Sequence, residues 1–107
     1  EVPSDALGVL QDIHWSHGSF GYFPTYTIGS FYAAQFFNQA KIENPNLLKE
    51  IEDGNNKNLL NWLRKNIHKN GKRLDAHQLC EKISGEKLNF KYFKEYVIEK
   101  YSKIYSL

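Results

Sequence analysis

A short stretch near the start of the chain gathers the residue types that enzymes use to bind and polarise substrates. It contains Gln11, Asp12, His14 and Trp15 within five positions. Such polar groups are costly to bury without hydrogen-bond partners. Their clustering therefore predicts a binding or catalytic site rather than an ordinary stretch of hydrophobic core.

Two tyrosines follow this stretch closely. Tyr22 and Tyr26 are four residues apart. Either hydroxyl could donate a hydrogen bond to an anionic oxygen, as could the imidazole of His14. Tyrosine is also a common packing residue, so residue type alone favours a structural role for both rings.

His14 and His17 are three residues apart, a spacing that would present two imidazoles to one metal ion if a helix continued to His17. Gly18 is expected to end such a helix, and no third ligand is clearly placed. We therefore predict no metal ligands in this sequence. His68 and His77 are lone histidines on predicted amphipathic helices, and no role is assigned to them.

A basic cluster lies further along the chain and consists of Lys65, Lys69, Lys72 and Arg73. It could bind phosphate, but a basic run on an amphipathic helix is usually a solvated face. Fourteen basic residues against 12 acidic ones give a net charge of +2, which does not indicate a nucleic-acid or membrane-surface partner. No apolar run approaches the roughly 20 residues of a membrane span.

The candidate site is predicted to lie on a short helix followed by a loop. The sequence Pro-Ser-Asp at residues 3–5 is typical of a helix N-terminus capped by Ser4 or Asp5, and we expect this helix to run towards Trp15. Helical spacing would place Gly8, Gln11 and Trp15 along one face of this helix, with Asp12 next to that face. Gly18 then predicts a loop over residues 16–23, which Gly21 also interrupts.

The rest of the sequence predicts only helices. Pro24 suits the first turn of a long helix, whose apolar side chains on nearly every side predict that it is buried. Further helices are predicted over residues 47–53, from Leu59 to Asn70, from a capping box of Asp75 with Gln78 to Gly85, and from about Asn89 onwards. No strand-like alternation persists, so we predict an all-α fold of five to six helices in a single domain spanning residues 1–107.

Two further features bear on the cellular context. Cys80 is the only cysteine, so it cannot form an internal disulfide, and its apolar neighbours favour a small buried side chain. A reducing compartment, the cytoplasm, is therefore expected. Because the chain begins without methionine and contains none, we expect it to be part of a longer protein.

The order Gly8-x-x-Gln11-Asp12-x-His14-Trp15 closely resembles a signature of the M32 (Taq-type) zinc carboxypeptidases. The resemblance is most specific from Val2 to Gln35 and extends more loosely over the whole chain. It implies that this sequence is the carboxy-terminal fragment of a longer, all-helical enzyme. Members of that family are usually dimers, and they remove single residues from the carboxyl termini of peptides in a deep groove.

The family holds zinc, or sometimes cobalt, with a His-Glu-x-x-His helix and a later glutamate. This sequence contains no His-Glu pair. The resemblance therefore implies that the metal site lies in an upstream catalytic portion of the same protein. The fragment alone is expected to bind no metal and to be inactive.

The resemblance also implies roles for individual residues. The substrate-binding positions of the signature are Gly8, Gln11, Asp12, His14 and Trp15. Because the oxyanion formed during peptide hydrolysis needs hydrogen-bond donors, our hypothesis is that His14 acts with Tyr22 or Tyr26, and that Asp12 orients His14. The alternative is a free-standing helical interaction module that never meets a catalytic portion.

Overall fold

The computed structural model describes residues 3–8 and 10–106, so Val2 and Val9 of the resemblance lie outside the described residues. Every regular element within them is a helix, which confirms the all-α prediction. The elements in chain order are a 3₁₀ turn η1 (Asp5–Leu7), α1 (Pro24–Glu43), α2 (Leu47–Glu52), α3 (Lys57–Asn66), a 3₁₀ turn η2 (His68–Asn70), α4 (Ala76–Ser84) and α5 (Lys91–Tyr105). No helix in the described ranges is both long and apolar enough to cross a membrane.

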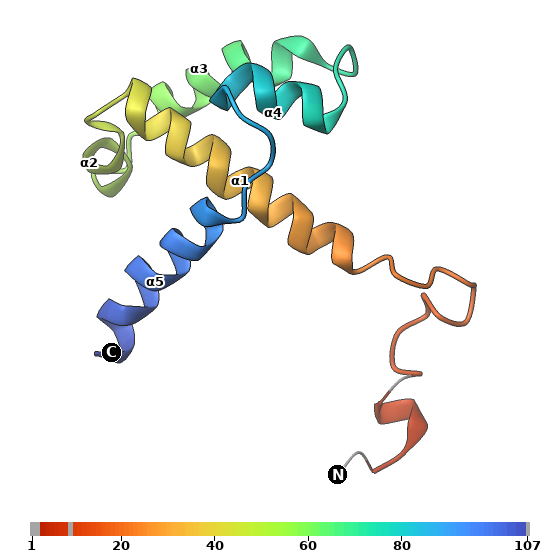
Figure 1. Cartoon of the computed structure of the whole chain (residues 1–107). Helices are drawn as coiled ribbons and strands as arrows, with labels where there is room; N and C mark the ends of the chain where they lie inside the picture. Colours follow the sequence, from red (N-terminus) through yellow and green to blue (C-terminus); the bar gives the residue numbers. More distant parts are fainter. Residues whose placement is uncertain (1–2, 9, 107) are drawn as a thin grey trace.

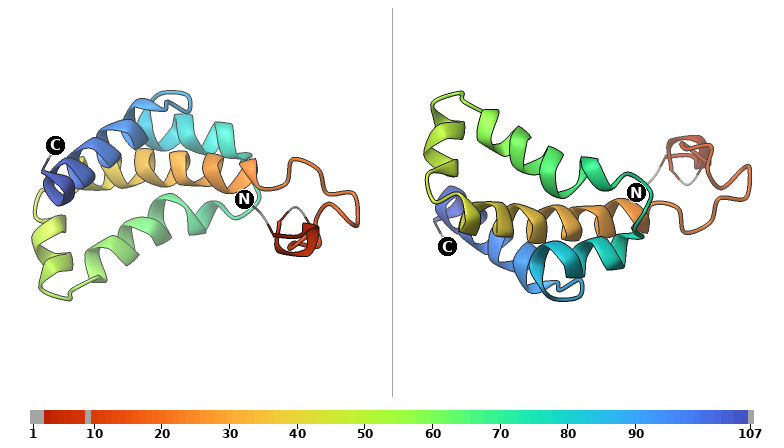
Figure 2. Two further views of the ribbon diagram at one scale, coloured as in Figure 1. Left: turned by 90° about the horizontal axis from the view of Figure 1, so that it is seen from below. Right: turned by 90° about the horizontal axis from the view of Figure 1, so that it is seen from above.

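The long helix α1 is the axis of the helical body (Figure 1). Helices α4 and α5 pack against it, and α2 folds back at its C-terminal end. Helix α3 lies on the other side of α1 from α5 (Figure 2). The chain before Pro24 extends away from this body without a helix beside it.

Local sequence signals set several helix boundaries. Pro24 occupies the first turn of α1, where its missing N–H costs nothing. The Asp75 carboxylate accepts a hydrogen bond from the backbone N–H of Gln78, whose side chain in turn accepts from the backbone of Asp75. Gly85 ends α4 with a φ of 74°, a conformation that favours glycine. The predicted capping box is therefore confirmed.

A small core joins α1, α2 and α3. Ala40, Leu47 and Trp62 are buried, and seven partly buried apolar side chains pack against them: Phe36, Phe37, Ile51, Leu59, Leu63, Ile67 and Ile83. The indole N–H of Trp62 donates to Glu43 Oε2 at 2.8 Å, so its polar atom is satisfied. Cys80 is fully buried and forms no disulfide, as the sequence predicted.

The prediction that α1 is buried on nearly every side was wrong. Only Gln35 and Ala40 of this helix are buried, and Tyr26 and Ile28 are 60% and 45% exposed. The reason is geometric, because the N-terminal turns of α1 project beyond α4 and α5 and have no neighbouring helix (Figure 1).

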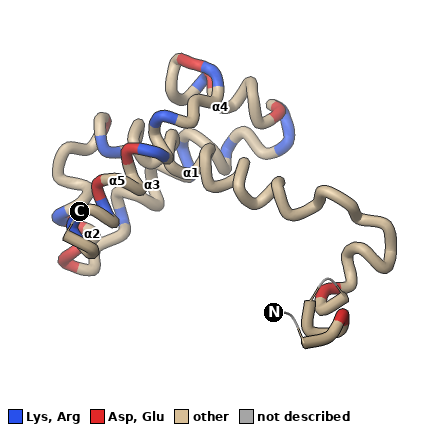
Figure 3. The backbone as a smooth tube through the Cα atoms, turned by 60° about the horizontal axis from the view of Figure 1, so that its bottom comes forward, with Lys and Arg blue, Asp and Glu red and all other residues tan. Residues whose placement is uncertain are grey.

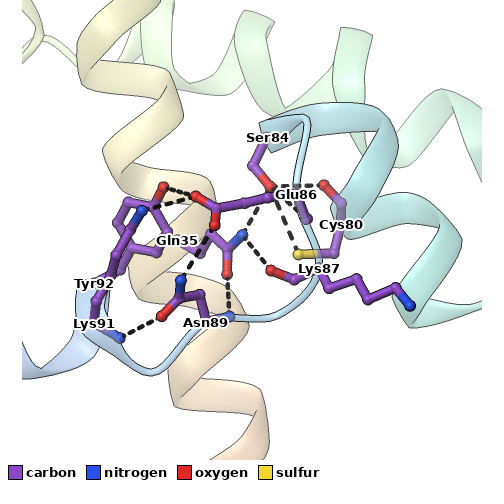
Figure 4. Close-up of polar contacts among 8 residues, drawn as sticks. All are labelled: Gln35, Cys80, Ser84, Glu86, Lys87, Asn89, Lys91 and Tyr92. Carbon is purple, nitrogen blue, oxygen red and sulfur yellow. Dashed lines mark hydrogen bonds and ion pairs between the residues drawn. The ribbon is translucent and has the colours of Figure 1, made fainter.

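Gln35 ties α1 to the connection between α4 and α5 (Figure 4). Its buried side-chain amide donates to Ser84 Oγ at 2.8 Å and to the Lys87 carbonyl at 3.2 Å. Its amide oxygen accepts the backbone N–H of Asn89 at 2.9 Å. One glutamine thus satisfies polar groups on both sides of the turn that sends the chain from α4 into α5.

Glu86 organises the same connection from the outside (Figure 4). Its carboxylate accepts hydrogen bonds from the Tyr92 hydroxyl, from Lys91 Nζ at 3.0 Å and from Asn89 Nδ2 at 3.2 Å. These donors, the Tyr92 hydroxyl first, lower the pKa of Glu86 from its ordinary value of 4.5 to about 2. The first turn of α5 is therefore fastened by a carboxylate that stays ionised at low pH.

We predict that Gln35→Ala destabilises the chain by about 2–3 kcal/mol, because the Asn89 N–H loses its acceptor in a partly buried position. The matched control is Gln39→Ala, one turn later on α1, whose side chain bonds only to exposed Glu43. Urea unfolding followed by circular dichroism measures both. Equal losses of unfolding free energy in the two variants would contradict the role of Gln35.

We predict that Glu86 contributes stability that is complete above pH 4.5 and is lost as the pH falls towards its folded pKa of about 2. The folded pKa is depressed, so protonation favours the unfolded chain. The difference in urea midpoint between wild type and Glu86→Gln should therefore shrink over this pH range. Glu81→Gln on α4 serves as the control, and a constant difference for Glu86→Gln would rule the linkage out.

Candidate functional site

The residues of the sequence signature do not lie on a helix, contrary to the prediction. The 3₁₀ turn η1 ends at Leu7, and turns and bends replace the expected helix from residue 10 to residue 18. Ser4 makes no side-chain capping hydrogen bond. The Asp12 carboxylate instead accepts the backbone N–H of His14 at 2.9 Å, a local turn that competes with helical hydrogen bonding.

The loop expected after the signature is present and turns the chain back on itself. Gly18 and Gly21 have φ values of 84° and 74°, which a residue with a Cβ rarely adopts. The N–H of Ser19 donates to the His14 carbonyl at 2.8 Å, which closes the loop. The reversal brings Tyr22 next to His14.

His14 is the centre of the site. Its Nδ1 atom contacts the Asp12 carboxylate, and its side chain is 26% exposed. The imidazole stacks on the Tyr22 ring, with centroids 4.9 Å apart and planes inclined by 15°, and it also contacts Phe23 at 4.8 Å. The carboxylate and the two rings orient the imidazole, and no hydrogen bond recorded among the described residues uses its Nε2.

Tyr26 completes the cluster from the first turns of α1. Its hydroxyl donates to the Tyr22 hydroxyl at 3.3 Å, and the two rings meet edge to face with centroids 5.5 Å apart. This hydrogen bond to Tyr22 raises the pKa of Tyr26 above its ordinary value of 10.0. Tyr26 thus keeps its proton at neutral pH.

The remaining signature residues lie to one side of this cluster. Trp15 packs on Phe20, with ring centroids 5.4 Å apart, and is 53% exposed. The Gly8 carbonyl accepts the N–H of Gln11 at 3.0 Å. The structure therefore brings Asp12, His14, Tyr22 and Tyr26 together. In the part of the chain that the structure describes, no recorded side-chain contact joins Gly8, Gln11 or Trp15 to this cluster.

Phe23, which the sequence patterns did not single out, also contacts His14 directly. Its position immediately before Pro24, the first residue of α1, was the available signal. A residue at a helix start next to a loop is held in place by the helix that follows it.

The histidine pair does not make a metal site. His14 and His17 have ring centroids 5.5 Å apart, and His17 bonds to Ser19 Oγ at 2.9 Å. Within residues 3–8 and 10–106, no three His, Cys, Asp or Glu side chains are placed to hold a metal ion. The residues present therefore do not fit a catalytic metal centre.

The other sequence candidates lie away from the cluster. His77 Nδ1 contacts the Tyr32 hydroxyl at 3.1 Å and links α4 to α1. The basic cluster runs from the last turn of α3 to just beyond η2 and is exposed on the helical body, away from the chain before Pro24 (Figure 3).

Among the residues described, the chain before Pro24, called here the signature loop, makes no recorded hydrogen bond to the helical body beyond the first turn of α1. Every recorded hydrogen bond made by residues 3–23 stays within residues 4–26. Large apolar side chains on the loop are open to solvent: Leu7 at 65%, Leu10 at 58%, Ile13 at 68% and Phe20 at 70%. Such a patch is typical of a surface that another part of a protein covers.

Comparison with known proteins decides the family. The sequence model of the Carboxypeptidase Taq (M32) metallopeptidase family matches residues 1–101 of this chain. The chain belongs to the M32 metallopeptidase family. Within it, thermostable carboxypeptidase 1 of Thermus thermophilus is 43% identical over 98 residues, which cover 92% of this chain and 19% of that protein.

Two solved structures share the arrangement of the helices. The crystal structure of the M32 carboxypeptidase from Deinococcus radiodurans superposes with a TM-score of 0.91 at 36% identity, over 98% of this chain and 21% of that one. The solved structure of a protein called CHT gives a TM-score of 0.87 at 58% identity, over 94% of this chain and 20% of that one. The chain thus spans about a fifth of the length of these M32 relatives.

The surroundings of Asp12 generate a prediction about its ionisation. The backbone N–H of His14, followed by its imidazole, holds the pKa of Asp12 below its ordinary value of 3.8. His14→Ala removes only the imidazole, so the pKa of Asp12 should rise relative to wild type yet stay below 3.8. A carboxyl-detected NMR titration measures it, and a pKa at or above the ordinary value would refute the local turn.

Proposed function

We propose that this chain is the substrate-groove portion of a metal-dependent carboxypeptidase, carboxy-terminal in the whole protein, which hydrolyses single residues from peptide C-termini. The observation that carries the proposal is the cluster of His14, Tyr22 and Tyr26, with Asp12 bound to His14. Membership of the M32 family supports the reaction class. The cluster brings the His14 imidazole and two tyrosine hydroxyls together on one loop and the helix start that follows it.

In this proposal, His14, protonated on both ring nitrogens, donates from Nε2 to the oxyanion that forms on the scissile carbonyl, together with one of the two tyrosines. Preorganised donors of this kind act strongly because they need no rearrangement during the reaction. The hydrogen bond from Tyr26 to Tyr22 leaves the proton of Tyr22 free for the oxyanion, which supports Tyr22 as the direct donor. Tyr26 would then hold Tyr22 in place.

Asp12 is a positioning residue in this scheme. Its carboxylate accepts the proton of His14 Nδ1, so Nε2 can donate only when the imidazole is protonated on both nitrogens. In this proposal the neighbouring carboxylate stabilises that imidazolium and fixes its orientation. The other signature residues, Gly8, Gln11 and Trp15, are proposed to contact the peptide. Gln11 offers an exposed amide and Trp15 a half-exposed ring beside the cluster.

The metal, zinc or cobalt, belongs in this proposal to the upstream part of the same protein, since the described residues here do not fit one. The chain by itself is then inactive. We further propose that the complete enzyme is a homodimer, as the family resemblance implies, and that it is cytoplasmic, as the lone buried Cys80 favours.

We predict that His14→Ala in the complete enzyme lowers kcat by about 100-fold or more and changes KM much less, because an oxyanion donor acts mainly in the transition state. Tyr22→Phe should produce a loss of the same order, and Tyr26→Phe a smaller one. Steady-state hydrolysis of a blocked dipeptide measures these constants.

Tyr32→Phe is the matched control, since Tyr32 lies on the same helix as Tyr26 but bonds to His77 on α4. It should leave kcat unchanged. An unaltered kcat for His14→Ala would reject the assignment of His14, and a larger loss for Tyr26→Phe than for Tyr22→Phe would exchange the roles of the tyrosines.

A further inference from the structure

An apolar groove remains open between α1 and α3. Its volume is about 420 Å³. Helix α1 contributes Ala33, Phe36 and Phe37, α3 contributes Leu59 and Leu63, and Ile67 follows α3 as its C-cap. The two helices diverge towards α2 (Figure 2).

The walls of the groove present no unmet polar group. Trp62 reaches it from α3, but its indole N–H already donates to Glu43. The apolar side chains that pack on the small core stay only partly buried there. An occupant must therefore offer an apolar surface, because a charged or amide group would find no partner.

A second copy of this chain does not suit the groove. In a two-fold dimer the same surface of each subunit meets its counterpart. Two concave apolar grooves placed face to face leave each other unfilled. The occupant must be convex, as the ridge of an amphipathic helix is.

The length of the M32 relatives indicates where such a helix could come from. They are about five times as long as the stretch that matches this chain. We propose that an amphipathic helix from the part of the protein outside this chain lies in the groove between α1 and α3, with large aliphatic side chains at positions i, i+3 or i+4, and i+7. This inference rests on the proposed function, in which the chain is one portion of a longer enzyme.

The groove lies in the helical body, whereas the proposed catalytic cluster lies on the loop that extends away from that body (Figure 1). Docking in the groove would fix the direction of α1 relative to the rest of the enzyme. Because Pro24 begins α1 directly after Phe23, the same contact would also set the position of His14 and its tyrosines.

The test is site-specific photo-cross-linking in the complete protein. A p-benzoylphenylalanine residue replaces Leu63 in one variant and Leu59 in a second, so that failure of one to fold leaves the other. The control places the probe at Arg64, which is exposed and does not line the groove. Mixing isotope-labelled and unlabelled protein before irradiation separates cross-links within one polypeptide from those between copies.

We expect the groove probes to cross-link within one polypeptide to a helix outside these 107 residues, and the Arg64 probe to give no such product. The proposal would be overturned if the groove probes cross-linked to a second copy or to a small molecule. It would also be overturned if they cross-linked only within these residues, or gave no product. Carboxypeptidase activity of the wild-type complete protein is assayed separately. A cross-link without activity would reject the proposed function alone, and activity without the cross-link would reject the docking alone.

Discussion

The buried amide of Gln35 is the interaction on which the arrangement of the helical body depends. It is fully buried on the central helix, and its two ends satisfy backbone and hydroxyl groups on both sides of the turn between α4 and α5. A buried amide tolerates few geometries, because each lost partner costs desolvation free energy that nothing replaces. The directions in which α4 and α5 leave that turn are thereby fixed relative to α1, and Glu86 secures the start of α5 from outside.

The candidate site follows a different principle from the body that carries it. His14 is oriented by neighbours within a dozen residues, namely Asp12, Tyr22, Phe23 and Tyr26. The loop as a whole has no recorded hydrogen bond to α2, α3, α4 or α5, and its apolar side chains face solvent. Local geometry can thus prepare the imidazole and the tyrosines as donors. In the proposed enzyme, the part of the protein outside this chain covers the loop and places these donors against the substrate.

Sequence signals predicted the body better than the site. Pro24, the Asp75 capping box and Gly85 act through their nearest neighbours, so the boundaries that they set were predictable. The helix predicted through His14 failed because the Asp12 carboxylate takes the N–H that a helix would need, a competition that residue type reveals only as a tendency. Gln35 is a polar residue flanked by apolar ones in α1, but its hydrogen-bond partners lie about 50 positions further along the chain. Residue spacing could not identify them. The meeting of His14 with Tyr22 likewise depends on a glycine-rich loop whose path the sequence does not specify.

The central claim is that this chain supplies the substrate side of an M32 active site and not its metal centre. The most direct measurement compares carboxypeptidase activity on a blocked dipeptide, with zinc or cobalt added, for this chain alone, for the complete protein, and for this chain mixed with the remaining portion. The account predicts activity in the complete protein, and in the mixture if the two portions assemble, but none in the chain alone. Activity of the chain alone would contradict it by locating a catalytic centre within these 107 residues. Inactivity of every sample would contradict the enzyme itself and favour a helical interaction module.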